Sequence, residues 1–147
     1  MIGEKEIRGL IPHAGSMCLL ESVESWDDAA VTCSTRTHRD PAHPLRRNGE
    51  LSALHLIEYG AQAMAIHGGL LARRDSGQAA APGLLTAVRD CVLHVQRVDD
   101  IETPLTVSAH RLLASAGGWM YQFEVSADGR CLAQGRLSVI PLATPGT

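Results

Sequence analysis

Hydrophobic and polar residues alternate along most of the chain, and one long stretch departs from that pattern. Alternation with a period of two predicts strands over 17–25, 29–37, 84–97, 105–114, 118–127 and 131–141. Asp27-Asp28 separates the first two strands as a hairpin turn would, and Asp128-Gly129 is a strong turn signal between the last two. The pattern therefore predicts a hairpin, then four longer strands later in the chain.

The exceptional stretch, residues 50–72, predicts one long helix. It contains no proline, is rich in Leu and Ala, and repeats its apolar residues at helical spacing. These apolar positions are Leu54, Ile57, Ala61, Met64 and Ala65. A proline-containing loop over 38–49 precedes the helix, and a linker of small residues over 75–83 follows it. One apolar helix among antiparallel strands predicts an α+β fold, with a curved sheet wrapped around the helix.

Composition limits the size and the class of the protein. The 147 residues predict one domain, 1–147, and the hydrophobic share of 45% is typical of a folded chain. Only 3% of the residues are aromatic, so the core must consist of aliphatic side chains. A net charge of -3 gives no reason to expect nucleic acid as a partner. Local basic clusters could still dock an acidic carrier protein.

The chain shows no targeting segment and no membrane span. Its first ten residues carry four charged side chains, and no apolar run approaches the roughly 20 residues that a membrane helix needs. We therefore expect a soluble, cytoplasmic protein. The four cysteines are spaced singly, which excludes common zinc and redox motifs and favours reduced, buried thiols.

Glu58 is the anomaly of the predicted helix. Residues three and four apart share a helical face, so His55, Glu58 and Gln62 form a polar stripe beside the apolar one. Burying a carboxylate costs several kcal/mol unless it is paired or protonated. The stripe therefore either faces water or marks a site, and periodicity alone leaves both open.

Two motifs in this chain resemble one known family. Glu58-Tyr-Gly-Ala-Gln-Ala63 is similar to the Glu-x-x-Ala-Gln-Ala stretch on the central helix of 3-hydroxyacyl-[acyl-carrier-protein] dehydratases. Leu10-Ile-Pro-His-Ala-Gly-Ser-Met17 is similar to the Leu-Pro-His segment that leads into their first strand. The resemblance covers about residues 8–140 and is greatest to the dehydratases of aryl-polyene clusters.

The resemblance implies a hotdog fold of about six strands around the helix, paired into a dimer with sites at the interface. It implies that substrates arrive as 3-hydroxyacyl thioesters on the phosphopantetheine arm of an acyl carrier protein, and that trans-2-enoyl thioesters leave. A homodimer or a higher homo-oligomer is expected, and a heterodimer remains an alternative. No cofactor is expected. A hotdog thioesterase and a non-catalytic acyl-binding subunit of a heteromeric dehydratase are the alternative functions.

The resemblance also implies that Glu58 acts with a histidine. Elimination of water needs a base for the C2 proton and an acid for the leaving hydroxyl. The family loop Gly-His-Phe-Pro-Gly is replaced here by Ala42-His-Pro-Leu-Arg46. His13, in the Pro-His segment, is therefore the expected base, with His43 in this altered loop as the main alternative and His55 or no histidine as the others. The alternative for His13 is a hydrogen bond that locks its own loop.

Three further residues are expected to bind substrate. His55 and Gln62 share the face of Glu58, and backbone N–H groups from Gly49 to Ser52 would stabilise a thioester enolate if the helix began there. The other four histidines, His38, His67, His94 and His110, are expected at exposed or half-buried positions without a role. Their spacing predicts no metal site. Five arginines are either solvated or dock the carrier protein: Arg39, Arg46, Arg47, Arg73 and Arg74.

Overall fold

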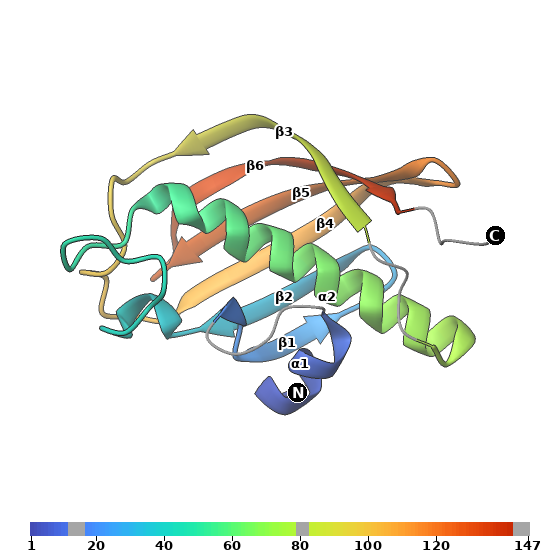
Figure 1. Ribbon diagram of the computed structural model, residues 1–147, viewed down its shortest axis with the longest axis horizontal. Helices are drawn as coiled ribbons and strands as arrows, with labels where there is room; N and C mark the ends of the chain where they lie inside the picture. Colours follow the sequence, from blue (N-terminus) through green and yellow to red (C-terminus); the bar gives the residue numbers. More distant parts are fainter. Residues whose placement is uncertain (12–16, 79–82, 143–147) are drawn as a thin grey trace.

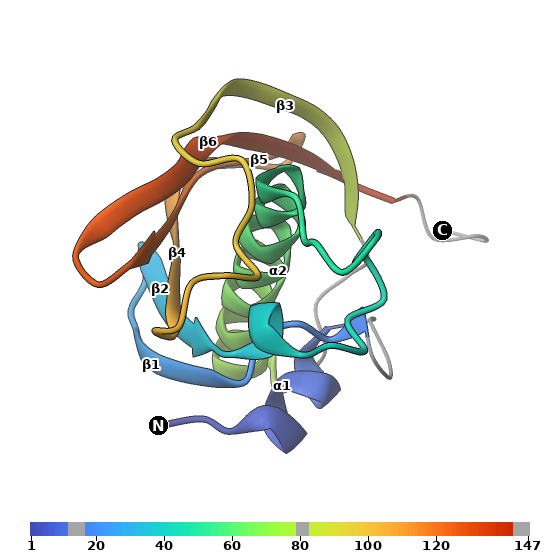
Figure 2. The same cartoon turned by 90° about the vertical axis from the view of Figure 1, so that its left-hand side faces the viewer.

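The structure, a computed structural model, describes residues 1–11, 17–78 and 83–142. Six antiparallel strands form one sheet in the order β1-β2-β4-β5-β6-β3 (Figure 1). The strands are β1 (Ser22–Trp26), β2 (Ala30–Thr35), β3 (Gly83–Leu93), β4 (Leu105–Ser115), β5 (Gly118–Ala127) and β6 (Arg130–Pro141). The sheet curves around the long helix α2 (Leu56–Ser76), as Figure 2 shows in a view nearly along the helix axis. This arrangement confirms the predicted hotdog fold.

The core between α2 and the sheet is mainly aliphatic, and its buried aromatic side chains are Tyr59, Tyr121 and Phe123, the one phenylalanine in the sequence. The Phe123 ring occupies a slot between Gly60 of α2 and Gly135 of β6. A Cβ at Gly60 would lie 2.5 Å from Phe123 Cγ, and one at Gly135 would lie 2.9 Å from Phe123 Cε1. The two glycines therefore let the helix and the sheet approach closely around one ring.

The helical region begins and ends later than the sequence pattern predicts. A 3-10 turn, η3 (Ala53–His55), leads into α2, and residues 50–52 stay outside the helix. Arg47 and Glu50 exchange two backbone hydrogen bonds of 2.9 and 3.0 Å across Asn48-Gly49, whose φ angles of 54° and 78° make a tight turn. At the other end α2 runs through Gly68-Gly69 and stops at Gly77, whose φ of 72° provides a left-handed cap.

The buried face of α2 differs from the predicted apolar stripe. Leu54 is 57% exposed, and Ile57, Ala61 and Ala65 are only half-buried. Only Met64 of that stripe is buried. The helix instead buries a face that includes polar side chains and glycines: Leu56, Tyr59, Gly60, Gln62, Ala63, Ile66, His67 and Leu70. The apolar pattern of the sequence misplaces the buried face because it assigns polar side chains to the surface. Here Tyr59, Gln62 and His67 are buried, and hydrogen bonds inside the protein satisfy their polar groups.

Two further elements differ from the sequence prediction. A short helix, α1 (Glu4–Leu10), was not predicted and packs on α2, where Gly69 leaves room for the Leu10 carbonyl. Strand β3 ends at Leu93 rather than at Arg97 and forms one edge of the sheet. Its alternation is interrupted by a register shift near Asp90, whose φ is 52°.

Candidate active site on the central helix

Glu58 and Gln62 lie one helical turn apart on α2 and are hydrogen-bonded. Gln62 Nε2 donates to Glu58 Oε1 at 3.1 Å. Glu58 is half-buried, whereas Gln62 has no exposed surface. The polar stripe therefore turns inward at Gln62 and does not simply face water.

Gln62 also holds the chain segment that precedes β1. Its Nε2 donates to the Met17 carbonyl at 2.7 Å, and its Oε1 accepts from the Leu19 N–H at 2.8 Å. The Leu19 carbonyl in turn accepts from Thr35 Oγ1 at 2.6 Å and Thr37 Oγ1 at 2.7 Å. Within the described residues the Gln62 amide thus contacts two backbone groups of the protein itself, and its expected contact with substrate stays a prediction.

His43 is buried beside the same turn of α2, where it joins a chain of hydroxyl groups. Its Nε2 lies 3.0 Å from the Tyr59 hydroxyl, which lies 2.9 Å from Thr37 Oγ1. Its Nδ1 accepts from the Leu45 N–H at 3.1 Å. A neutral ring that accepts at Nδ1 carries its proton on Nε2, so His43 donates to Tyr59.

Burial and neighbouring charges favour this neutral form. Desolvation lowers the pKa of His43, and the nearby His55 and Arg46 lower it further. Burial raises the pKa of Tyr59 to about 12, so its hydroxyl stays protonated. The protonated hydroxyl can accept a hydrogen bond from His43 and donate one to Thr37 Oγ1. Both ring nitrogens of His43 are therefore occupied within the protein.

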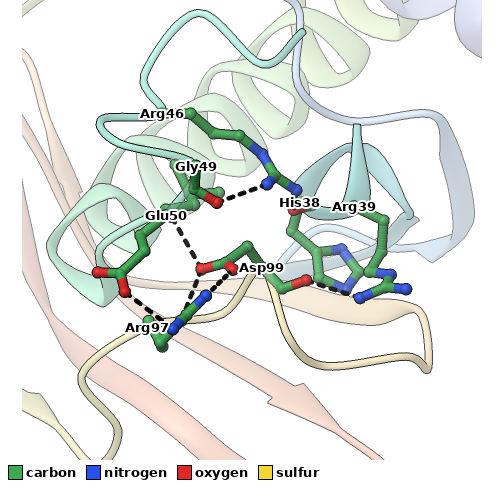
Figure 3. A network of polar contacts seen from close by, with 8 residues as sticks. His38, Arg39, Arg46, Gly49, Glu50, Arg97 and Asp99 are labelled. Atoms are coloured by element: carbon green, nitrogen blue, oxygen red, sulfur yellow. Dashed lines mark hydrogen bonds and ion pairs between the residues drawn. The ribbon is translucent and has the colours of Figure 1, made fainter. Parts of the chain in front are cut away.

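A polar junction fixes the chain just before α2 (Figure 3). Asp99, which is 6% exposed, accepts from the Leu51 N–H at 2.9 Å and pairs with Arg97. Arg97 also binds Glu50 at 2.9 Å. The Arg97 guanidinium holds the pKa of the Asp99 carboxyl well below its usual range. In the sequence, only the separation of two residues between Arg97 and Asp99 points to this pair.

This junction accounts for the late start of the helix and changes the expectation for Gly49. The Ala53 N–H donates to the Gln96 carbonyl at 2.9 Å, and the Leu54 N–H donates to Ser52 Oγ at 3.2 Å. The N–H groups of Leu51, Ala53 and Leu54 thus have acceptors in the protein. Gly49 lies in the exposed turn before the junction and not at the helix terminus. The prediction that N–H groups over 49–52 start the helix is wrong.

The histidines divide into buried and accessible groups. His38 and His67 are fully buried, contrary to the expectation of exposed or half-buried positions, whereas His94 and His110 are exposed. His67 lies 2.6 Å from the Tyr121 hydroxyl and 2.8 Å from the Asp27 carbonyl, so it joins α2 to the β1–β2 turn and to β5. His55 is half-buried at the start of α2. His13, the other expected base, lies outside the described residues.

Most of the expected docking arginines contact the protein itself. Arg46 is half-buried and donates to the carbonyls of Gly49 at 2.8 Å and His38 at 3.2 Å (Figure 3). Arg39 donates to the Asp99 carbonyl at 2.7 Å. Near the other end of α2, Arg73 lies 3.6 Å from Glu6, and Arg74 pairs with acidic neighbours. These contacts favour a role in fixing loops.

The described part of the chain shows neither a metal cluster nor a membrane helix. No three His, Cys, Asp or Glu side chains among these residues are arranged to hold a metal ion. Within 1–11, 17–78 and 83–142, no helix has the length and apolar character required to cross a bilayer. Cys18 and Cys33 are buried, as expected, while Cys91 and Cys131 are half-buried; all four thiols are free.

Solved structures with the same architecture include a dehydratase. The dehydratase heterocomplex ApeI:P from Xenorhabdus doucetiae is 26% identical, with a TM-score of 0.82 over 94% of this chain and 91% of that chain. AziG of S. sahachiroi is 16% identical, with a TM-score of 0.59 over 92% and 99%. A hypothetical thioesterase with coenzyme A from Streptococcus pneumoniae TIGR4 is 11% identical, with a TM-score of 0.61 over 84% and 86%. The last two show a common fold only.

A family model gives the more specific result. No curated protein matches the chain significantly. The ApeP-like model, described as ApeP dehydratase, matches residues 5–145, a range that contains both motifs and every element of the sheet. This chain belongs to the ApeP-like dehydratase family.

Proposed function

We propose that this protein removes water from 3-hydroxyacyl thioesters carried on acyl carrier protein and forms trans-2-enoyl thioesters. The observation that carries the proposal is the half-buried Glu58 carboxyl, bonded to Gln62 on the central helix of a dehydratase-family fold. A chain from a polyene or another fatty-acid-like assembly line is the expected substrate class. The resemblance of the two sequence motifs supports this class.

In the proposed reaction Glu58 is the acid. A base takes the C2 proton, and the electrons of the C2–H bond form a thioester enolate. The enolate then forms the C2=C3 double bond while the C3–O bond breaks. Glu58 gives its proton to the departing hydroxyl, which leaves as water. A partly buried carboxyl suits this role because a protein can control the access of water to it.

We assign the base to His13 rather than to His43. A base needs a free lone pair on nitrogen, and His43 uses one nitrogen to accept from Leu45 and the other to donate to Tyr59. His13 lies in the Pro-His motif, four residues before Met17, whose carbonyl is held by Gln62 next to Glu58. His43 then supports the site by holding Tyr59.

The Glu58→Gln variant tests the proposal. It keeps the shape of the side chain but removes the acidic proton, so enoyl formation from a 3-hydroxyacyl thioester should fall by at least about 100-fold. Ultraviolet absorbance of the enoyl thioester measures dehydration, and release of free thiol measures hydrolysis. Glu124→Gln, on the exposed face of β5, is the matched control and should retain wild-type turnover. Near-wild-type dehydration by Glu58→Gln would exclude Glu58 as the acid, and thiol release without enoyl would indicate a thioesterase.

A second candidate is a non-catalytic subunit that completes a heteromeric dehydratase. The occupied His43 ring favours it, since the family's usual base loop cannot act here as it stands. The solved ApeI:P structure is itself a heterocomplex. Turnover by the purified chain alone would exclude this candidate, whereas turnover only after addition of an active paralogue would favour it.

A further inference from the structure

We infer that Gln62 is a positioning residue that couples the Glu58 carboxyl to the chain segment 17–19, and that it does not bind substrate. The inference rests on the proposed function of Glu58 and extends it to the residue that orients the carboxyl. It follows from the hydrogen bonds of the buried Gln62 amide, which joins Glu58 on one side to the segment 17–19 on the other.

The orientation of the Gln62 amide is determined by backbone groups. Its oxygen faces the Leu19 N–H at 2.8 Å, and its nitrogen faces the Met17 carbonyl at 2.7 Å. Turning the amide over would place oxygen against a carbonyl and nitrogen against an N–H. Because Gln62 is fully buried, water cannot compensate either mismatch. The flipped state is therefore excluded.

The fixed orientation leaves one N–H for Glu58. That N–H meets Oε1 at 3.1 Å, so Oε1 is the accepting oxygen whichever protonation state the carboxyl adopts. Because the unprotonated oxygen of a carboxyl is the better acceptor, this hydrogen bond favours Oε2 as the carrier of the proton that Glu58 gives to substrate. Gln62 thus selects the oxygen that works as the acid.

The segment that fixes Gln62 is itself held from the opposite side. Thr35 and Thr37, at the end of β2 and just beyond it, donate to the Leu19 carbonyl at 2.6 and 2.7 Å. Thr37 also bonds Tyr59 of α2 at 2.9 Å. Gln62 therefore binds the N–H of Leu19, and the hydroxyls of Thr35 and Thr37 bind its carbonyl. These contacts fix the distance between the segment 17–19 and Glu58.

The inference predicts three changes in Gln62→Met, which preserves length and burial but removes every hydrogen bond of the amide. The Leu19 amide should exchange with solvent at least about 10-fold faster, because its acceptor is gone. The 13C resonance of the Glu58 carboxyl should shift. The kcat per folded molecule should fall by about 10- to 100-fold with KM within about threefold of wild type, since a misplaced group slows the chemical step.

Gln122→Met is the matched control. Gln122 lies exposed on β5, so this variant should leave the Leu19 amide, the Glu58 carboxyl resonance and kcat unchanged. Glu58→Gln identifies the carboxyl resonance and should retain the protection of Leu19. If Gln62→Met does not fold, Gln62→Asn carries the same measurements, because its amide is one methylene too short to reach both backbone groups.

The outcomes separate the inference from the proposed function. Unchanged exchange at Leu19, an unshifted Glu58 carboxyl, or a raised KM with normal kcat in Gln62→Met would overturn the positioning role. If the wild-type protein forms no enoyl product while Leu19 exchange and the Glu58 resonance respond as expected, the coupling stands and the proposed dehydration does not.

Discussion

At the level of single residues, polar side chains of α2 bind backbone and hydroxyl groups that lie far away in the sequence. Gln62 reaches Met17 and Leu19, Tyr59 reaches Thr37 and His43, and each contact spans at least 16 residues. Such partners have no signature in a local pattern. Glu58 could be singled out because an acid in an apolar helix is unusual in sequence, whereas nothing in the local pattern points to the polar partners of Tyr59.

Paired histidine variants test the assignment of the base. If His13 takes the C2 proton, His13→Ala should lose about 100-fold or more in kcat, as expected for a positioned general base. His43→Ala should instead lose about 1–3 kcal/mol of unfolding free energy, because the Leu45 N–H and the Tyr59 hydroxyl lose their partner. Proton exchange at C2 of the substrate, measured per folded molecule, should vanish only in His13→Ala. Loss of exchange in His43→Ala alone would reverse the assignment, and full activity of both would refute the His–Glu mechanism.

At the level of elements, the type of every strand and of the long helix was predictable, whereas the ends of β1, β3 and α2 were not. Period-two alternation identified β5 without error and β4 to within one residue. The start of α2 depended on Asp99 and Gln96 taking up the N–H groups of Leu51 and Ala53, which no local propensity encodes. The short helix α1 was missed because its stability comes from packing on α2.

Two glycines within α2 provide a matched test of helix packing. Gly60→Ala should destabilise the protein by about 1–3 kcal/mol, because the new methyl group would overlap the Phe123 ring. Gly68→Ala meets no atom within 4 Å and should stabilise it by about 0.5–1 kcal/mol through helix propensity. Urea unfolding of both variants measures the difference. Adding Phe123→Leu should recover part of the Gly60→Ala loss, and equal effects at the two glycines would contradict the close approach at Gly60.

At the level of the whole molecule, the edge strand β3 carries a mostly apolar, exposed surface. Five apolar side chains along it are between 38% and 50% exposed: Leu84, Leu85, Val88, Val92 and Leu93. A long edge with such a surface normally pairs with another chain. The edge strand β3 and the half-buried apolar residues Ile57, Ala61 and Ala65 of α2 together favour an oligomer. The partner would be either a second copy of this chain or a related subunit.

We expect the purified protein to be a dimer or a larger assembly at micromolar concentration by light scattering. Val88→Lys should shift it toward the monomer, since a charge on the edge strand would oppose pairing. Leu113→Lys introduces the same charge at a residue of β4 that is 58% exposed and should leave the mass unchanged. A monomeric and active wild-type protein would contradict the expected oligomer.

The three buried histidines predict how stability depends on pH. Desolvation lowers the pKa of His38, His43 and His67 in the folded protein. Unfolding restores ordinary histidines, with pKa values of about 6.5, which take up protons first as the pH falls. Stability should therefore be greatest above about pH 6.5 and decline below it, by at most about 1.4 kcal/mol per pH unit for each histidine. Urea unfolding between pH 8 and 5 checks this.

The same experiment has its own control. His67→Gln should reduce the slope of stability against pH below neutrality, even if it lowers stability overall, whereas the exposed His94→Gln should keep the wild-type slope. A stability that is constant from pH 8 to 5 would show that these imidazoles become protonated without unfolding.

The two tyrosines of the chain give it built-in optical reporters for the first turn and the middle of the central helix. Tyr59 is bonded to His43 near the start of α2, and Tyr121 is bonded to His67 in its later half. Burial raises the pKa of each phenol to about 12. Tyrosinate absorbance at moderately alkaline pH would therefore signal that the packing around one of these two turns has opened, and replacing one tyrosine with phenylalanine would tell which of them opens first.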